Sequence, residues 1–182
     1  MKNSVIKKFS ILILSLVFSV SVMADTTKSK FERDALTIDG IISAYYSLVS
    51  GPKGFKYNPT MDTFLHAPNA IITRFKANGD FQRHTLLVEQ KALEEPYVEG
   101  FYEIEIHRTE QRYANIAHVW STYEVRPTPD GKASQRGINS ISLYLKDGRW
   151  WIASWNAQTE SANNLPPEYL PESGLRSEAG VE

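Results

Sequence analysis

The feature that most constrains this chain is a series of four long segments after residue 100 with the character of β-strands. Apolar and polar residues alternate between Phe101 and Arg108, which places them on opposite faces of an extended chain. Three more extended segments follow: Ile116 to Arg126, Gly137 to Lys146 and Arg149 to Thr159. Turn signals such as Asp147-Gly148 separate them, so we predict that consecutive strands pair antiparallel. A meander of this kind forms a core when helices pack on one of its faces.

The helices are expected upstream of this meander. Ala35 to Ser50 carries apolar residues at three- and four-residue steps, and Gly51-Pro52 is a strong stop signal. Four more elements are expected: a short helix from Asn58 to Pro68, strands from Asn69 to Phe75 and from Phe81 to Thr85, and a helix from Leu87 to Glu95. The order predicts the α+β class, with N-terminal helices packed in a strongly curved antiparallel sheet.

The first 24 residues have the pattern of a secretory signal. Lys2, Lys7 and Lys8 precede an apolar run from Phe9 to Val22, and Val22-Met23-Ala24 supplies the residues that flank a cut. We therefore predict cleavage after Ala24 and a periplasmic or secreted protein with no membrane attachment afterwards. The alternative is an uncleaved anchor, although the apolar run is shorter than the roughly 20 residues that a span needs.

Composition excludes several classes of function. The chain has no cysteine, which excludes disulfides, thiolate metal sites, cysteine nucleophiles and lipoprotein anchoring. Its net charge is −1 with no basic block, so nothing indicates a nucleic-acid partner. We expect a flexible lead-in at residues 25–34, one domain at 35–160 and a mobile tail at 161–182.

The strand region also carries the segments of a known superfamily. They are Asn115 to Glu124, Arg136 to Ile141 (Arg-Gly-Ile-Asn-Ser-Ile) and Asp147 to Ile152 (Asp-Gly-Arg-Trp-Trp-Ile). With the amphipathic first helix, they make the chain resemble the nuclear-transport-factor-2-like superfamily, which includes SnoaL-like and ketosteroid-isomerase-like proteins. The resemblance is closest to small bacterial members without an assigned activity. It implies a cone-shaped sheet around three helices, a cavity at the wide end, and a homodimer formed through the outer face of the sheet.

The superfamily contains isomerases, polyketide cyclases, dehydratases and non-catalytic subunits, so fold alone does not select a function. The isomerase pattern uses a carboxylate base, a protonated carboxylate and a tyrosine donor. Tyr45 and Tyr46 lie on the matching first helix. Asn69 stands where many catalytic relatives carry an acid, and an amide cannot accept a proton as a general base. This difference argues against isomerase chemistry.

Candidate ligand-binding residues come from the strands and the first helix. His118 and Trp120 share one face of their strand, and Ser121 and Tyr123 share the other, so only one of these two sets can face a cavity. Trp120 and Trp155 offer flat walls for a ring-containing ligand, although such aromatics also form cores and dimer interfaces. The candidate set is Tyr45, Glu105, His118, Trp120, Tyr123, Asn139 and Trp155.

Other polar groups have competing interpretations. Glu103 and Glu105 share a strand face and can act as paired acids, or they can form ion pairs with nearby arginines. His107 and His118 lie opposite each other if their turn centres between Arg112 and Tyr113, but the spacing matches no metal motif. We therefore predict no metal centre. We also predict no cofactor, because the turn glycines do not lie between a strand and a helix start.

These observations leave three functional hypotheses. The first is an exported domain that binds a small apolar or aromatic molecule, or scaffolds a partner, without catalysis. The second, the main alternative, is an isomerase-, cyclase- or dehydratase-like enzyme that transfers a proton on a small cyclic substrate. The third is a structural dimer without a ligand. An enzyme requires a desolvated acid or histidine within hydrogen-bond reach of open cavity space.

Overall fold

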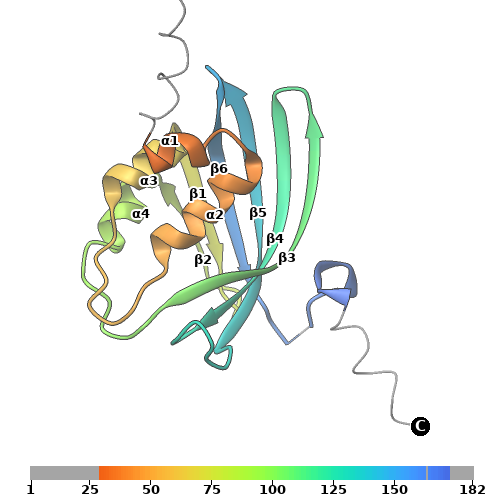
Figure 1. Ribbon diagram of the computed structural model, residues 1–182. Helices are drawn as coiled ribbons and strands as arrows, with labels where there is room; N and C mark the ends of the chain where they lie inside the picture. Colours follow the sequence, from red (N-terminus) through yellow and green to blue (C-terminus); the bar gives the residue numbers. More distant parts are fainter. Residues whose placement is uncertain (1–28, 163, 173–182) are drawn as a thin grey trace, which may run out of the picture.

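The computed structural model describes residues 29–162 and 164–172, so the predicted signal peptide and its cut after Ala24 lie outside the described residues (Figure 1). The elements are α1 (Lys30–Asp34), α2 (Ile38–Val49), α3 (Pro59–Leu65), β1 (His66–Phe75), β2 (Phe81–Thr85), α4 (Leu86–Ala92), β3 (Tyr102–Tyr113), β4 (Ile116–Arg126), β5 (Gln135–Lys146), β6 (Arg149–Thr159) and the 3-10 turn η1 (Pro167–Tyr169). No helix in this described part of the chain has the length and apolar character of a membrane span.

One six-stranded sheet organises the molecule, in the order β2-β1-β6-β5-β4-β3. β1 and β6 run parallel and every other neighbouring pair is antiparallel, so the sheet is mixed where the sequence predicted an antiparallel one. The sheet curves around the helices, and η1 lies on its opposite side (Figure 1). The predicted α+β class and cone-like architecture are confirmed.

The first predicted helix begins three residues later than expected. Thr37 adopts an extended backbone and its Oγ1 accepts the Gly40 N–H at 2.9 Å, so α2 begins only at Ile38. A separate short helix, α1, begins after Ser29, which forms a capping box with Glu32. Part of the predicted lead-in is therefore helical. The apolar face of α2 packs into the core of the cone, with Ile41 completely buried.

β1 begins earlier than predicted. The sequence predicted a start at Asn69 because Pro68 ends a helix, but the strand begins at His66 and includes Pro68. Its pairing with β6 shifts register between His66 and Ile71, and Pro68 lies within that irregular stretch. A proline cannot donate to a strand ladder, and an irregular stretch is where a sheet tolerates one.

The hairpin of β3 and β4 turns later than the position that would bring the two histidines together. Its last pair is Tyr113 with Ile116, and Ala114 in the turn has φ of +48°. His107 therefore pairs with Thr122 while His118 pairs with Gln111, and a bulge at Ile106 changes the register only for the residues before His107. Within the described residues, no three His, Cys, Asp or Glu side chains form a group that could hold a metal ion.

Candidate functional site

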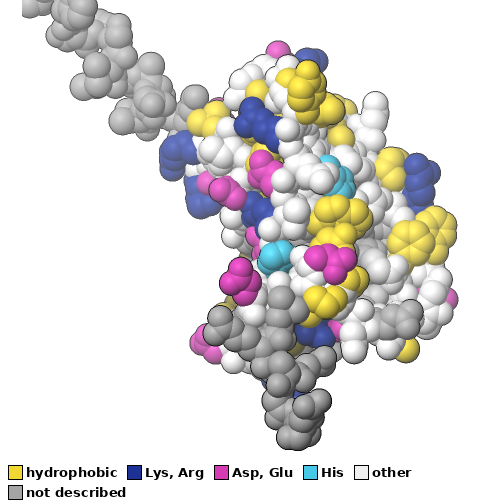
Figure 2. Space-filling model, turned by 90° about the vertical axis from the view of Figure 1, so that its right-hand side faces the viewer, with side chains coloured by type: hydrophobic (Ala, Val, Ile, Leu, Met, Phe, Trp, Pro, Cys, Tyr) yellow, Lys and Arg dark blue, Asp and Glu magenta, His cyan; other side chains and the backbone are white. Residues whose placement is uncertain are grey.

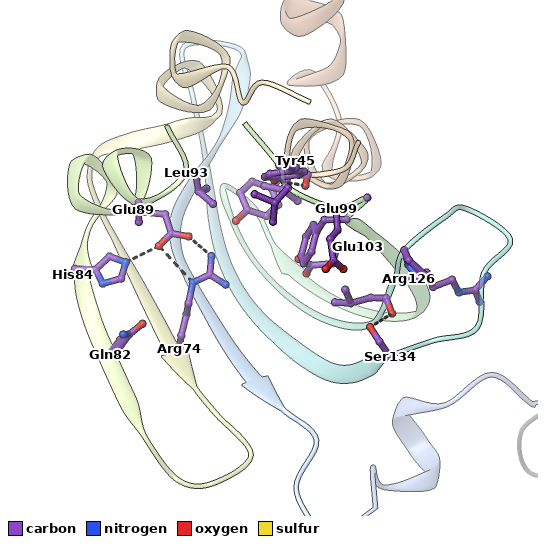
Figure 3. Close-up of a pocket in the computed structure, with 18 residues that line it drawn as sticks. Tyr45, Arg74, Gln82, His84, Glu89, Leu93, Glu99, Glu103, Arg126 and Ser134 are labelled. Carbon is purple, nitrogen blue, oxygen red and sulfur yellow. Dashed lines mark hydrogen bonds and ion pairs between the residues drawn. The ribbon is translucent and has the colours of Figure 1, made fainter. Parts of the chain in front are cut away.

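A pocket of about 740 Å³ opens beside the end of α2 (Figure 3). It lies between the end of α2, the segment from α4 to β3, and the strands β1, β2 and β3. Its apolar lining comprises Tyr45, Val49, Leu93, Tyr97, Val98, Phe101 and Val125. Its polar lining includes Arg74, His84, Glu89, Glu99 and Glu103.

The aromatic wall of the pocket is held by contacts behind it. The Tyr45 ring lies 3.8 Å from that of Trp155, between ring centroids, and Trp155 is 2% exposed. Tyr97 donates its hydroxyl proton to the Val49 carbonyl at 2.7 Å. Its ring meets that of Phe101 edge-on at 5.7 Å. The rings are thus fixed before any ligand arrives, which lowers the entropy lost on binding.

The end of α2 is joined to the start of β3, which places Glu103. Gly51 and Phe101 exchange two backbone hydrogen bonds of 2.8 and 2.9 Å. The Ser50 hydroxyl accepts the Glu103 N–H at 3.0 Å and contacts the Glu103 carbonyl at 3.2 Å. This local pairing fixes the backbone of Glu103, and its side chain projects toward the pocket from the side opposite Arg74 (Figure 3).

The carboxyl of Glu103 has an amide partner and no cationic one. Its Oε1 accepts from Asn139 Nδ2 at 3.1 Å, and no basic side chain of the described residues forms an ion pair with it. Burial raises the pKa of Glu103, while the Asn139 hydrogen bond and the charge of Arg74 act in the opposite direction. The pocket reaches this side chain. Glu103 is therefore a carboxyl with a raised pKa that lines the open space of the pocket.

A second polar group lies on the opposite wall of the pocket. The carboxylate of Glu89, whose side chain is 6% exposed, accepts hydrogen bonds from Arg74 through Oε1 and contacts His84 Nε2 through Oε2 at 2.6 Å (Figure 3). Burial alone would raise the pKa of Glu89, but its hydrogen bonds to Arg74 and His84 and their charges lower it overall. Arg74 and Glu89 thus form a largely self-neutralised pair at the pocket wall.

Sequence reasoning missed this pair. The available signal was a single arginine in the apolar run Ala70 to Phe75, because a charge in a strand buried between neighbours requires a partner. The partners His84 and Glu89 lie on β2 and α4, and nothing in their spacing indicates that the chain folds them onto β1.

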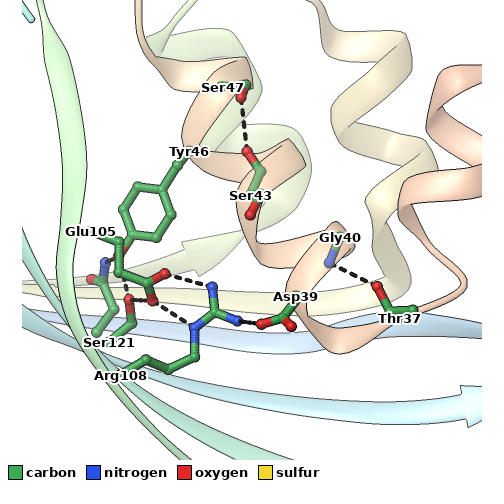
Figure 4. A network of polar contacts seen from close by, with 10 residues as sticks. Thr37, Asp39, Gly40, Ser43, Tyr46, Ser47, Glu105, Arg108 and Ser121 are labelled. Carbon is green, nitrogen blue, oxygen red and sulfur yellow. Dashed lines mark hydrogen bonds and ion pairs between the residues drawn. The ribbon is translucent and has the colours of Figure 1, made fainter.

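A hydrogen-bonded network continues from Glu103 away from the pocket, and Figure 4 shows its part from Tyr46 to Arg108. Asn139 Nδ2 also donates to the Tyr46 hydroxyl at 3.0 Å, which leaves the Tyr46 proton to be donated to Ser121 Oγ at 2.7 Å. Ser121 in turn donates to Glu105. The network therefore has one consistent direction, from the Asn139 amide to the Glu105 carboxylate, and it holds Asn139 in place beside Glu103.

Glu105 lies at the far end of this network as an ion-paired carboxylate. Arg108 donates to both of its oxygens, at 2.9 and 2.5 Å, and also contacts Asp39 (Figure 4). The sequence left two interpretations open for Glu103 and Glu105, and the structure gives each a different environment. Glu105 forms the ion pair, and Glu103 does not.

The predicted site residues lie in four different places: at the pocket, in the core, in a separate groove and on the outer face of the sheet. Tyr45 lines the pocket, Asn139 donates to the carboxyl of Glu103, and Trp155 supports Tyr45 from behind. Tyr123 points inward into the core, 4% exposed, without lining the pocket. Glu105 lines a separate groove between α2 and β3.

His118 and Trp120 lie on the outer face of the sheet and cannot contact a ligand in the pocket. Alternation along β4 turns Val119, Ser121 and Tyr123 inward, so these two residues face outward. His118 Nε2 contacts Ser140 Oγ at 3.0 Å, and the Trp120 ring packs on that of Tyr169 at 5.6 Å. Asn69, at the position where many relatives carry an acid, is exposed and lies outside the pocket lining.

Comparison with known proteins supports the fold and little beyond it. No family model matches the sequence, and no curated protein matches it significantly. A Nostoc punctiforme protein of unknown function with a cystatin-like fold has TM-score 0.53 and 11% identity, over 69% of this chain and 90% of that one. NTF2-like proteins of unknown function from Shewanella baltica and Silicibacter pomeroyi have TM-scores of 0.49 and 0.46, at 13% and 11% identity, over 74% and 66% of this chain and 98% and 90% of theirs.

The likeness to the Nostoc punctiforme protein, at 11% identity, supports the fold that the resemblance implied and nothing more. Identities this low carry no substrate, partner or catalytic residue from those proteins to this chain.

Proposed function

We propose that this domain binds a small, largely apolar molecule in the pocket beside Tyr45 and does no chemistry on it. The observation that carries the proposal is a pocket of about 740 Å³ with fixed aromatic walls and a few polar groups. Ligand sites commonly combine these properties: concave shape, apolar lining and a small number of placed polar anchors. Val98 at the lining is 82% exposed, so a bound apolar molecule would also cover surface that water contacts now.

A neutral fluorescent dye tests this proposal. N-phenyl-1-naphthylamine brightens in an apolar site, and Leu93→Trp places a larger side chain in the pocket lining. Leu87→Trp is the matched control, because Leu87 lies in α4, the helix whose C-cap residue is Leu93, and is 74% exposed. We expect the dye to bind the wild type and Leu87→Trp with similar Kd, and Leu93→Trp at least roughly tenfold more weakly. Equal binding by both variants would overturn the proposal.

Proton transfer at Glu103 is a second candidate function, and one specific observation favours it. Glu103 is the carboxyl that meets the requirement for an enzyme, since it faces open space in the pocket and burial raises its pKa. The test is deuterium exchange at the acidic carbon of a cyclic enone such as 3-methylcyclohex-2-enone, followed by NMR. The wild type should accelerate exchange over buffer and Glu103→Gln should not. No acceleration by the wild type removes this candidate.

We also propose that the chain acts outside the cytoplasm as a homodimer formed through the outer face of the sheet. The N-terminal pattern ending at Ala24 supports export. Figure 2, which views the side of β3, β4 and η1, shows apolar side chains grouped among polar ones. Phe75, Trp120 and Ile138 line a shallow depression of about 290 Å³ on the outer face, which a second copy would cover.

A further inference from the structure

The charged groups that line the pocket do not balance one another. Arg74 is engaged by Glu89, and Arg126 by Glu124 at 2.5 Å, so both arginines have acidic partners. Glu103 has no basic partner within the described part of the chain. The carboxyls of Glu89 and Glu103 approach the pocket from opposite sides (Figure 3). Glu99 at the lining has no ion pair among the described residues either, but it is exposed to solvent, so Glu103 is the less exposed pocket carboxyl without a counter-ion.

The second oxygen of Glu103 is available to a ligand. Oε1 accepts from Asn139, while no hydrogen bond from the described residues reaches Oε2. An ionised carboxylate has about four acceptor sites, so most of its capacity is unused. The Gly51 and Ser50 contacts fix the backbone at Phe101 and at Glu103, and Asn139 fixes the carboxyl. The acceptor is therefore placed before a ligand binds.

Aromatic rings line the same pocket as this carboxyl. Tyr45, Tyr97 and Phe101 all contribute to the lining, and Phe101 lies two residues before Glu103 on the chain. Aromatic faces attract cations through their ring quadrupole, by about 0.5–2 kcal/mol per contact. A carboxyl without a counter-ion and a set of rings favour the same kind of ligand.

We propose that the ligand is a small organic ammonium ion with an apolar or aromatic body. This inference rests on the proposed function, because it names the chemical class of the molecule bound in that pocket. The ammonium N–H groups donate to Glu103 Oε2, and the body contacts Tyr45, Tyr97 and Phe101. A carboxylate ligand is disfavoured, because the Arg74 guanidinium is already engaged and a second anion would lie near Glu89 and Glu103.

Binding of an ammonium ion should displace a proton from Glu103. Titratable and charged groups that influence it come from several elements: Arg74 on β1, Glu89 on α4, Tyr45 and Tyr46 on α2, Tyr97 before β3 and Tyr123 on β4. The pKa of each of these tyrosines is raised by burial, so they stay neutral, and the charges of Arg74 and Glu89 oppose each other. Glu103 is then the group that ionises to meet the ligand.

Three probes with one body separate the charge of the ligand from its apolar contact. They are 2-phenylethylamine, which is an ammonium ion at pH 7, 2-phenylethanol and 3-phenylpropionate. We expect calorimetry to give at least roughly tenfold tighter binding of the amine than of the alcohol, with the carboxylate weakest. Repeating the amine titration in two buffers of different ionisation enthalpy between pH 4.5 and 7 should reveal proton release. The alcohol should release none.

Glu103→Gln is the decisive variant, since Gln retains an oxygen acceptor for Asn139. It should abolish the preference for the amine and leave the Kd of the alcohol within about twofold. Glu110→Gln is the control, because Glu110 lies on the same strand, is exposed to solvent and does not line the pocket. Binding of the alcohol or carboxylate as tightly as the amine overturns the inference and leaves the binding proposal standing. If neither the dye nor any probe binds the wild type, the proposed function itself fails.

Discussion

Two glutamates two positions apart on β3 show how neighbouring residues of one type acquire different properties. Glu105 is ion-paired with Arg108 three residues along the same strand. Glu103 instead contacts the amide of Asn139, from β5, and burial raises its pKa. The bulge at Ile106 contributes, since it shifts the register beyond Glu105 and brings Arg108 back toward that carboxylate. Glu105 therefore has an arginine partner, whereas Glu103 has only an amide.

The raised pKa of Glu103 predicts how stability depends on pH. The folded protein holds this proton at pH values where the unfolded chain has released it, so the unfolded state binds fewer protons there. The contribution of Glu103 to stability is therefore full below about pH 4.3 and declines as pH rises to the folded pKa. Urea unfolding should show that Glu103→Gln becomes more stable relative to the wild type at pH 8 than at pH 4. A stability difference between the variant and the wild type that stays constant with pH, or that has the opposite trend, contradicts a raised pKa for Glu103.

At the scale of elements, the short helix α4 depends on polar contacts for its position. Only Leu86, Glu89 and Gln90 of this helix are buried, while Leu87 and Val88 are exposed. Gln90 Nε2 donates to Thr63 Oγ1 at 2.9 Å, and Glu89 accepts from Arg74 on β1. These contacts attach α4 to α3 and to the sheet, and they form one side of the pocket.

Breaking the Arg74–Glu89 pair should therefore loosen α4. Arg74→Met leaves a 6% exposed carboxylate with only His84, which we expect to cost about 1–3 kcal/mol of unfolding free energy. This free-energy cost is lower than that of breaking a fully buried pair, because the Arg74 side chain is 38% exposed. Adding Glu89→Met removes the unpaired charge, so the double variant should cost less than the two single changes together. A denaturant double-mutant cycle measures this coupling, and strictly additive costs would refute it.

For the whole molecule, the outer face of the sheet is divided between the chain itself and open surface. Thr122 Oγ1 donates to the Tyr169 carbonyl at 2.6 Å, and Tyr169 packs on Trp120, so the η1 segment covers part of β4. The depression lined by Phe75 and Ile138 lies beside this contact. Any partner that uses the outer face therefore meets both the sheet and the η1 segment.

Mass spectrometry tests both the proposed export and the proposed dimer. Protein recovered from outside the cytoplasm should give a denatured mass that begins at Asp25, and native mass spectrometry should give twice that mass. Ile138→Arg places a charge at the proposed interface and should shift the protein to the monomer. Ser134→Arg, on the exposed turn before β5, is the control and should remain dimeric. A wild-type monomer at micromolar concentration rules out the dimer, and retained residues before Asp25 rule out the cut.

The sequence by itself determined the elements and the class of fold. Alternation marked β3 to β6, and turn pairs such as Asp147-Gly148, both with positive φ, marked where strands end. Such patterns act over a few residues, so each can be recognised locally. It also identified Tyr45 and Asn139 as candidates for the site.

Only the tertiary structure decided which face of β4 lies inside and which groups meet in the pocket. Alternation defines two faces without saying which one is buried, so His118 and Trp120 were candidates until the curvature of the sheet placed them outside. Arg74 meets Glu89 because α4 folds back over β1. Glu103 on β3 reaches Asn139 on β5 because the sheet bends, although β4 lies between their strands. Distances between residues far apart in sequence depend on strand order and bending, and no local pattern encodes either.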